Sequence, residues 1–357
     1  MRLTAWLRPL AYLGLTVGLV ACGSAPPAAP SAQPEAITPF NATPATAVAP
    51  VRIGIALGGG AAKGFAHIGV IKMLEANGFA PAVVSGTSAG SVVGALYAGG
   101  MNAFELQEKA VALDEASIRD LQLSSGGLVL GQKLEDYVNA QVRNQPLEKL
   151  AKPFVAVATR LEDGERTVFA RGNTGQAVRA SSSVPGVFQP VTIGTFHFVD
   201  GGVVSPVPVD AARQLGADIV VAVDISNKAR GKTPVDLLGT LGQSIAIMGQ
   251  KLGQAELARA DVIIRPQVLD IGSADFSQRA SAILEGEKAA LAAMPKIRER
   301  VAQLQTDRAQ AARLAQQQAE QARQQAAQAQ YQACLDNRSR LQKLAGMAGM
   351  DAACTPP

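Results

Sequence analysis

The sequence predicts an α/β fold with a mostly parallel central sheet, and two observations support this. Between residues 51 and 294, short apolar runs of the strand type alternate with longer segments that have the apolar spacing of helices. Such alternation is typical of parallel sheets covered by helices on both faces. The composition agrees, because 48% of the 357 residues are hydrophobic and only 17% are charged, as is common where strands are buried on both sides.

The elements follow one another in a regular order along this region. The strand candidates are Arg52–Leu57, Pro81–Ser85, Phe154–Thr159, Thr167–Ala170, Thr195–Val199, Ile219–Ile225 and Val262–Arg265. The helix candidates are Ala66–Asn77, Ala89–Ala98, Ala103–Asp114, Lys133–Val142, Asp210–Leu215 and Leu237–Ala260. Glycine turns follow the first two strands, at the edge of the sheet where sites form in such folds.

The first residues have the features of a secretory signal. Arg2 and Arg8 precede an apolar stretch, Leu10–Ala21, which is too short to cross a bilayer. The stretch ends in Leu-Val-Ala-Cys22, which resembles the bacterial lipobox, where the cysteine is acylated and the signal, residues 1–21, is removed. More than one acyl chain on Cys22 would give durable membrane anchoring. An ordinary signal peptide with an unrelated cysteine is the alternative.

Residues 22–50 predict an extended tether, because this segment is rich in Ala, Pro, Ser and Thr and carries a single charge, Glu35. Gly23 follows the lipobox cysteine, and the resemblance to Gram-negative lipoproteins implies sorting to the outer membrane, facing the periplasm. The expected location is therefore the bacterial cell envelope.

Residues 295–357 predict a long and mostly exposed helical tail. Pro295–Leu344 is rich in Gln, Ala and Arg and has only a broken apolar stripe. A solvated helix is favoured, with a coiled coil or contact with anionic lipid headgroups as alternatives. Cys334 and Cys354 could pair in an oxidising periplasm, or remain free, and neither has metal-ligand spacing. Between Pro295 and Ala345 there are nine Lys and Arg against four Asp and Glu, but no basic stripe with aromatics indicates nucleic-acid binding.

A candidate nucleophile stands in the second glycine turn, Gly86-Thr-Ser88-Ala-Gly90. A strand precedes this G-x-S-x-G sequence and a helix follows it. A nucleophilic serine must project from a sharp, strained turn, and glycine on either side removes side chains that would clash there. The N-terminus of the following helix also favours developing negative charge. We therefore predict Ser88 as the nucleophile of an acyl-transfer reaction.

The first glycine turn is a candidate oxyanion site. Gly58, Gly59 and Gly60 end the first strand and supply consecutive backbone N–H groups to a substrate oxygen. Phosphate binding fits poorly. Lys63 precedes Gly64 instead of preceding Ser or Thr, and a dinucleotide fingerprint would need glycine at position 63.

The general base is harder to assign, because the chain has only two histidines, His67 and His197. A triad of the α/β-hydrolase type would place the histidine after the acid, whereas His67 and His197 both precede the best acid candidate, Asp200. Asp200-Gly201-Gly202 is the better candidate. A carboxylate at a strand end, followed by a tight turn, can accept the serine proton directly if it lies within hydrogen-bond reach.

Taken in order, four motifs resemble those of the patatin-like phospholipase family, closely over Ile53–Pro208 and loosely to Met294. These are Gly58–Gly64, Gly86-x-Ser88-x-Gly90, Ala180-Ser-Ser-Ser-Val-Pro185-Gly-Val-Phe-Gln-Pro190 and Asp200-Gly201-Gly202. The resemblance implies a three-layer α/β/α catalytic domain over residues 51–294, with Ser88 as nucleophile, Asp200 as base and the oxyanion turn at Gly58–Gly60. The residues expected to support the motifs are Lys63, Gly64, Gly86, Gly90, Pro185, Gly201 and Gly202.

The resemblance further implies hydrolysis of lipid acyl esters without a metal or another cofactor, with membrane phospholipid or lysophospholipid as substrate. Two alternatives stay open. One is a carboxylesterase or thioesterase that acts on small acyl compounds, and the other is a non-catalytic envelope lipoprotein whose helical tail binds a partner.

Overall fold

The computed structural model describes residues 49–114, 120–124, 127–226, 237–345 and 354–356. The predicted signal, the lipobox residue Cys22 and nearly all of the predicted tether lie outside the described residues. No helix within the described ranges combines the length and the hydropathy needed to cross a bilayer.

The centre of the fold is a mixed sheet in which the strand order is β10-β9-β1-β2-β5-β8-β7, with β6 also paired to β5. The strands from β10 to β5 in this order are parallel, whereas β6 and β8 run antiparallel to β5, and β7 antiparallel to β8. The bounds are β1 Ile53–Leu57, β2 Val83–Thr87, β5 Phe154–Arg160, β6 Arg166–Phe169, β7 Val191–Ile193, β8 Phe196–Asp200, β9 Ile219–Val223 and β10 Val262–Ile264. The predicted mostly parallel sheet is confirmed.

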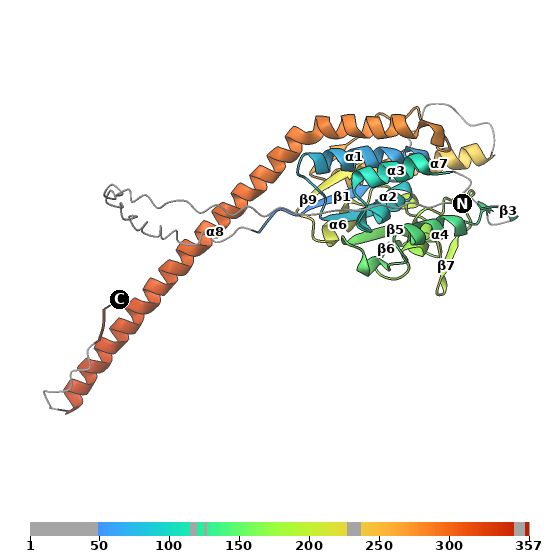
Figure 1. Cartoon of the computed structure of the whole chain (residues 1–357). Coiled ribbons are helices and arrows are strands. Elements are labelled where there is room, and N and C mark those ends of the chain that lie inside the picture. Colours follow the sequence, from blue (N-terminus) through green and yellow to red (C-terminus); the bar gives the residue numbers. More distant parts are fainter. Residues whose placement is uncertain (1–48, 115–119, 125–126, 227–236, 346–353, 357) are drawn as a thin grey trace, which may run out of the picture. The chain divides into compact units, whose positions relative to one another are not determined.

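Helices cover both faces of this sheet (Figure 1). The bounds are α1 Phe65–Ala76, α2 Ala89–Ala98, α3 Ala103–Ala112, α4 Gln132–Gln141, α5 Thr174–Ser181, α6 Val209–Gln214, α7 Leu237–Leu257 and α8 Arg279–Ala345. Short 3₁₀ turns lie at η1 Ala61–Gly64, η3 Leu147–Lys149, η4 Gly201–Val203 and η5 Phe276–Gln278. A separate hairpin pairs β3 Leu121–Ser124 with β4 Gly127–Val129.

Strand β1 shows how the layers form. Ile55 and Leu57 belong to the larger core cluster, which includes residues of α1 and α8. Ala56 points to the other face and packs in a second cluster with Ala212 of α6. Because successive side chains of a strand point to opposite faces, one apolar strand supplies both cores. The three-layer α/β/α arrangement is confirmed.

Three elements have no counterpart among the sequence predictions: helix α5, the β3–β4 hairpin and strand β7. The sequence does contain an N-cap residue for α5, Asn173, whose side chain accepts a hydrogen bond from the Gln176 amide at 2.9 Å. Gly175 in its first turn argued against a helix. Its role is in packing, since a Cβ there would lie 2.3 Å from the carbonyl oxygen of Glu135 in α4.

The prediction that the final helix begins at Pro295 is wrong, because α8 begins at Arg279 and passes through Pro295. Its first turns pack tightly on α1. A Cβ at Gly69 would lie 2.0 Å from the Ile283 carbonyl oxygen, and a Cβ at Gly286 would lie 2.0 Å from that of Ala66. This close crossing makes the beginning of α8 part of the same packed domain as α1.

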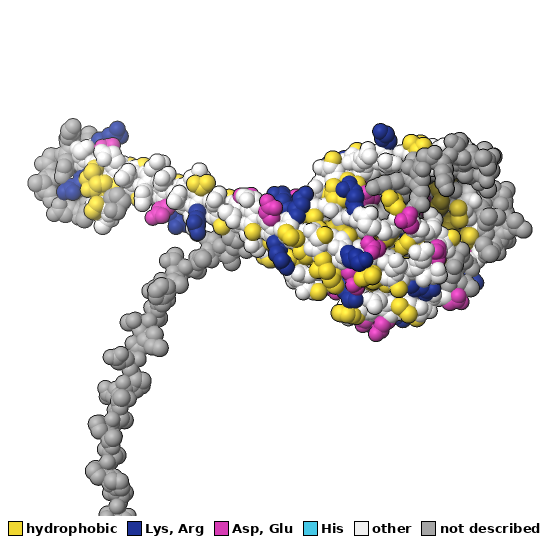
Figure 2. Space-filling view, turned by 90° about the horizontal axis from the view of Figure 1, so that it is seen from above, with side chains coloured by type: hydrophobic (Ala, Val, Ile, Leu, Met, Phe, Trp, Pro, Cys, Tyr) yellow, Lys and Arg dark blue, Asp and Glu magenta, His cyan; other side chains and the backbone are white. Residues whose placement is uncertain are grey.

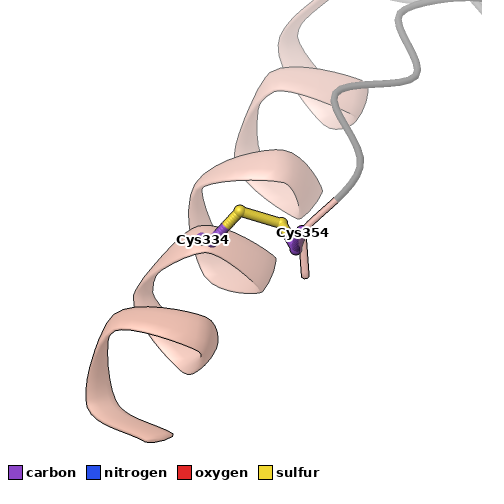
Figure 3. The surroundings of a disulfide bond; sticks show 2 residues. All are labelled: Cys334 and Cys354. Carbon is purple, nitrogen blue, oxygen red and sulfur yellow. A yellow bond between two sulfur atoms is a disulfide. The ribbon is translucent and has the colours of Figure 1, made fainter. Parts of the chain in front are cut away.

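The later part of α8 is mostly exposed (Figure 2), as the predicted solvated helix requires. Leu314 on this part is 58% exposed. Near its end, Cys334 forms a disulfide with Cys354, with 6.0 Å between the two Cα atoms (Figure 3). The pairing that the sequence left open is therefore present.

Candidate active site

Ser88 lies at the turn between β2 and α2. Its backbone has φ 55° and ψ −126°, a conformation that non-glycine residues seldom adopt and that costs on the order of 1–3 kcal/mol. Its amide donates a hydrogen bond to Ser181 Oγ at 3.0 Å, and its carbonyl accepts one from Ser91 Oγ at 2.7 Å. The strained turn predicted from the sequence is confirmed, and neighbouring hydroxyls hold it.

The glycines on either side allow this turn to be tight. A Cβ at Gly86 would lie 2.5 Å from the carbonyl oxygen of Gly90, and a Cβ at Gly90 would lie 2.1 Å from that of Leu57. Neither approach is possible for a residue with a side chain. The first turn of α2 can therefore rest directly on the ends of β1 and β2.

Asp200 lies at the end of β8, at the same edge of the sheet as Ser88. Because β8 is antiparallel to β5, its last residue, Asp200, lies opposite Ala158 of β5. On the other side of β5, Thr87 lies opposite Val157. Ser88 and Asp200 are therefore at the same level of the sheet, with β5 between their strands.

The turn after Asp200 is held by several backbone contacts. A Cβ at Gly201 would lie 2.1 Å from the carbonyl oxygen of Val157, so only glycine fits there. The Asp200 amide donates to the Ser183 carbonyl at 2.9 Å, and Thr159 Oγ1 donates to the Asp200 carbonyl at 2.9 Å. The backbone of Asp200 is thus fixed on both sides.

The carboxyl of Asp200 is buried and interacts with the Ser88 hydroxyl. Its Oδ1 also accepts a hydrogen bond from the Gly202 amide at 2.7 Å. Among the described residues, Oδ2 has no partner of conventional hydrogen-bond geometry, and catalytic contacts are often long before substrate binds. Burial raises the pKa of Asp200 to about 6, while the Ser88 hydroxyl and the Gly202 amide limit the rise. Such a carboxyl is a stronger base than an ordinary aspartate and is still mostly ionised at neutral pH.

The predicted oxyanion turn needs a correction. The amide of Gly58 donates to the Val223 carbonyl, and that of Gly59 to the Pro206 carbonyl, both at 3.0 Å. These two N–H groups are therefore occupied by the frame of the protein. The sequence could not show this, because both acceptors lie more than a hundred residues away in the chain.

Within the described part of the chain, the Gly60 and Ala61 amides have no hydrogen-bond partner. Ala61 has φ 53°, a second strained non-glycine residue close to Ser88 in the fold. Gly59 lies beside Ser88, since a Cβ on it would be 3.2 Å from the Ser88 Cβ. We call residues 58–61 the donor turn; its free donors are the last two amides.

The remaining predicted motif residues lie around this centre. A Cβ at Gly64 would lie 2.7 Å from that of Ala89, so this glycine allows η1 to contact the start of α2. Lys63 is buried in η1 and its amide donates to the Gly60 carbonyl at 3.2 Å. Pro185 is half-buried in the turn that follows α5. Supporting roles for Lys63 and Pro185 in catalysis stay predictions.

Among the described residues, neither histidine is hydrogen-bonded to Ser88 or Asp200. His67 is fully buried, and its Nε2 lies 2.8 Å from the Gly58 carbonyl oxygen, while burial lowers its pKa to about 4. It is therefore neutral and helps to hold the donor turn. His197 is at the surface, with Nδ1 2.8 Å from Glu162 Oε1.

Two site residues were missed in the sequence. Ser181 donates to the Val157 carbonyl at 2.6 Å and accepts from the Ser88 amide, so it links Ser88 to β5. It stands inside a recognised motif that suggested no role. Glu256 of α7 is buried and binds residues 205 and 207; its only signal was an isolated acid in a helix with few charges.

The geometry therefore combines a strained serine, a buried carboxyl in contact with it and two free amides nearby. A hydroxyl, a base and amide donors are the parts needed for acyl transfer. Within the described residues, no group of three or more His, Cys, Asp or Glu side chains is placed to hold a metal ion.

Comparison with known proteins supports the resemblance to patatin-like phospholipases that the sequence motifs indicated. Residues 55–213 match the family model described as patatin-like phospholipase. An uncharacterized NTE family protein of Mycobacterium tuberculosis is 35% identical over 183 residues, which are 50% of this chain and 51% of the relative. Patatin-like phospholipase domain-containing protein 6 of mouse is 30% identical over 184 residues, covering 49% of this chain and 14% of that protein. The chain spans about half the length, or less, of these curated relatives.

A solved structure agrees on the fold. VipD from Legionella pneumophila superposes with a TM-score of 0.51 at 15% identity, covering 68% of this chain and 67% of that one. At this identity the likeness concerns the fold alone. The family model identifies residues 55–213 as a patatin-like phospholipase domain, and the likeness to VipD agrees with its fold.

Proposed function

We propose that this protein hydrolyses acyl esters of membrane phospholipids or lysophospholipids through a Ser88–Asp200 dyad. The observation that carries the proposal is the contact between the hydroxyl of a strained Ser88 and the buried carboxyl of Asp200. The family relationship supports hydrolase chemistry of the patatin type.

In the first half of the reaction, Ser88 Oγ attacks the carbonyl carbon of the ester while Asp200 takes the hydroxyl proton. The negative charge that develops on the carbonyl oxygen is stabilised by the free amides of Gly60 and Ala61 and by the positive end of α2. Collapse of this intermediate breaks the bond to the alcohol oxygen. The leaving alcohol receives the proton from Asp200, and the acyl group stays on Ser88.

In the second half, water attacks the acyl-enzyme while Asp200 accepts a proton from it. The same amides hold the second oxyanion, the bond to Ser88 Oγ breaks, and the serine recovers its proton from Asp200. A fatty acid leaves. Because a carboxyl with a pKa of about 6 can both accept and return a proton near neutral pH, no histidine is required.

An apolar surface beside the site supports lipid rather than a small soluble ester as substrate. The inner face of α7 contacts the turn after Asp200, since a Cβ at Gly249 would lie 3.6 Å from the Gly202 carbonyl oxygen. The outer face exposes Ile247, Met248 and Leu252, which are 46%, 52% and 39% exposed. Soluble helices normally present polar residues there, and exposed apolar patches often mark membrane or ligand contacts.

We also propose that the protein is anchored in the bacterial cell envelope by lipid on Cys22, in the outer membrane and facing the periplasm. The lipobox-like Leu-Val-Ala-Cys22 after an apolar stretch supports this proposal. The disulfide between Cys334 and Cys354 is compatible with an oxidising compartment.

Replacing the nucleophile tests the proposed function directly. We expect Ser88→Ala to lower hydrolysis of p-nitrophenyl butyrate by at least about 10³-fold and to prevent labelling by a fluorophosphonate probe. His197→Ala is the control and should retain activity, because this side chain lies at the surface. Wild-type activity in Ser88→Ala would refute the proposal.

Asp200→Asn should abolish activity but stabilise the fold at high pH. Burial raises the pKa of Asp200 from 3.8 to about 6 in the folded protein. The folded state therefore binds this proton more tightly than the unfolded state does. The resulting stabilisation is fully present below pH 3.8 and is lost as the pH rises through 6. Asparagine does not ionise. We expect the variant to exceed wild type by roughly 3 kcal/mol at pH 8 and to lose this advantage near pH 4. Denaturant unfolding at both pH values measures the difference, and a larger gain at the lower pH would contradict the assigned sign.

Polar substitution on α7 should separate lipid access from chemistry. We expect Met248→Gln combined with Leu252→Gln to leave hydrolysis of p-nitrophenyl butyrate within about twofold of wild type. Because this double variant buries less apolar area at a bilayer, hydrolysis of phosphatidylcholine vesicles should fall by about tenfold. Leu314→Gln is the matched control, since this leucine is exposed on the distal part of α8. Equal losses on both substrates would argue against a lipid-contact role.

Cys22→Ser tests the anchor. We expect wild-type protein to sediment with membranes and to incorporate labelled palmitate in bacteria. The variant should do neither, since it lacks the thiol that carries the acyl chain. Cys354→Ser, which removes a different cysteine, should still sediment. Membrane association of Cys22→Ser equal to that of wild type would show that the segment is not a lipobox.

A further inference from the structure

Glu256, near the end of α7, is a buried acid that the reaction described above does not use. Glu256 is 5% exposed. Oε1 accepts a hydrogen bond from Ser205 Oγ at 2.5 Å, and Oε2 accepts one from the Val207 amide at 2.8 Å. The carboxylate therefore holds two residues of one short segment, Ser205–Val207, which we call the clamp segment.

The clamp segment in turn holds both sides of the candidate active site. The Pro206 carbonyl accepts the hydrogen bond of the Gly59 amide at 3.0 Å, and Gly59 lies against Ser88. The Ser205 carbonyl accepts the hydrogen bond of Thr87 Oγ1 at 2.8 Å, and Thr87 directly precedes Ser88. One segment thus fixes the donor turn and the end of β2.

We infer that Glu256 is a positioning residue, which holds the free amides of the donor turn at the correct place relative to Ser88 through the clamp segment. The inference rests on the proposed function, because it assigns Glu256 a part in the same site. A small displacement of the amides from the oxyanion would reduce turnover strongly, since oxyanion stabilisation depends on donor position.

The ionised form of Glu256 matches the observed contacts. Both of its oxygens accept hydrogen bonds, and hydrogen bonds to an ionised acceptor are stronger than neutral ones. Protonation of Oε1 would force the Ser205 hydroxyl to turn its hydrogen away. Among the described residues, that hydroxyl has no other acceptor. The clamp is therefore expected to hold more firmly when Glu256 is ionised.

Burial of Glu256, with smaller effects from its hydrogen bonds and from nearby charges, places this change near neutral pH. Burial raises its pKa to about 7, and the hydrogen bonds from Ser205 and Val207 oppose the rise. Arg166 of β6 lowers the pKa and Asp210 of α6 raises it, but less than burial does. Arg259 also faces Glu256 and binds Asp210 at 2.7 Å.

The test compares Glu256→Gln with Glu256→Ala in the full-length protein. Glutamine keeps an acceptor for the Val207 amide but cannot ionise, whereas alanine removes both contacts. With p-nitrophenyl butyrate at pH 8, we expect kcat to fall about tenfold for glutamine and about a hundredfold for alanine, with KM within about twofold of wild type. The inflection of kcat near pH 7 should be absent in Glu256→Gln.

Hydrogen exchange supplies a readout that does not need turnover. We expect the Gly59 amide to exchange faster in both variants than in wild type, because its acceptor, the Pro206 carbonyl, is held less firmly. The Val207 amide should exchange faster in Glu256→Ala, which removes its acceptor. Glu285→Gln is the matched control, since Glu285 pairs with Lys288 on α8 at 2.7 Å, and it should change neither kcat nor exchange at these amides.

The results separate this inference from the proposed function. If wild type shows no Ser88-dependent hydrolysis, the proposed function fails, while exchange still decides whether Glu256 holds the donor turn. If both variants lower the melting temperature but keep the wild-type kcat, pH profile and Gly59 exchange, Glu256 is only a structural residue. That outcome would overturn the inference.

Discussion

The contact between the Ser88 hydroxyl and the Asp200 carboxyl is the constraint around which the surrounding structure is arranged. A carboxyl must be buried for its pKa to rise to about 6, and burial of a charged group is unfavourable. The serine must also keep a backbone conformation that costs free energy. Neither feature would persist on a flexible loop. Strand β5, which lies between the two residues, gives them a common rigid support.

This support depends on close approach between backbone segments around the site. The glycines at 86, 90 and 201 each approach a carbonyl oxygen within a distance that a side chain would forbid. The buried hydroxyls of Ser181 and Thr159 then satisfy carbonyl groups around the site, because unpaired buried polar groups are costly. Tight packing and satisfied hydrogen bonds together hold the strained turn at Ser88.

Support for the site also comes from beyond the part of the chain that matches the family model. That match ends at residue 213, whereas α7 and α8 follow it. The inner face of α7 carries Glu256, which holds the clamp segment, and its outer face exposes apolar side chains. One helix therefore links the donor turn to an exposed apolar surface. The first turns of α8 pack on α1 through Gly69 and Gly286 and complete the larger core.

The sequence by itself determined the fold class, the strained serine turn and the aspartate turn, because each depends on local patterns: strand periodicity, G-x-S-x-G and Asp-Gly-Gly. It did not reveal which amides are free, since the acceptors of Gly58 and Gly59 are carbonyls of Val223 and Pro206. It also misplaced the start of α8 at Pro295 and left α5 unassigned, because packing overrode the local signals. Only the tertiary structure decided which donors, bases and buried acids meet, because hydrogen bonding and burial depend on neighbours that are distant along the chain.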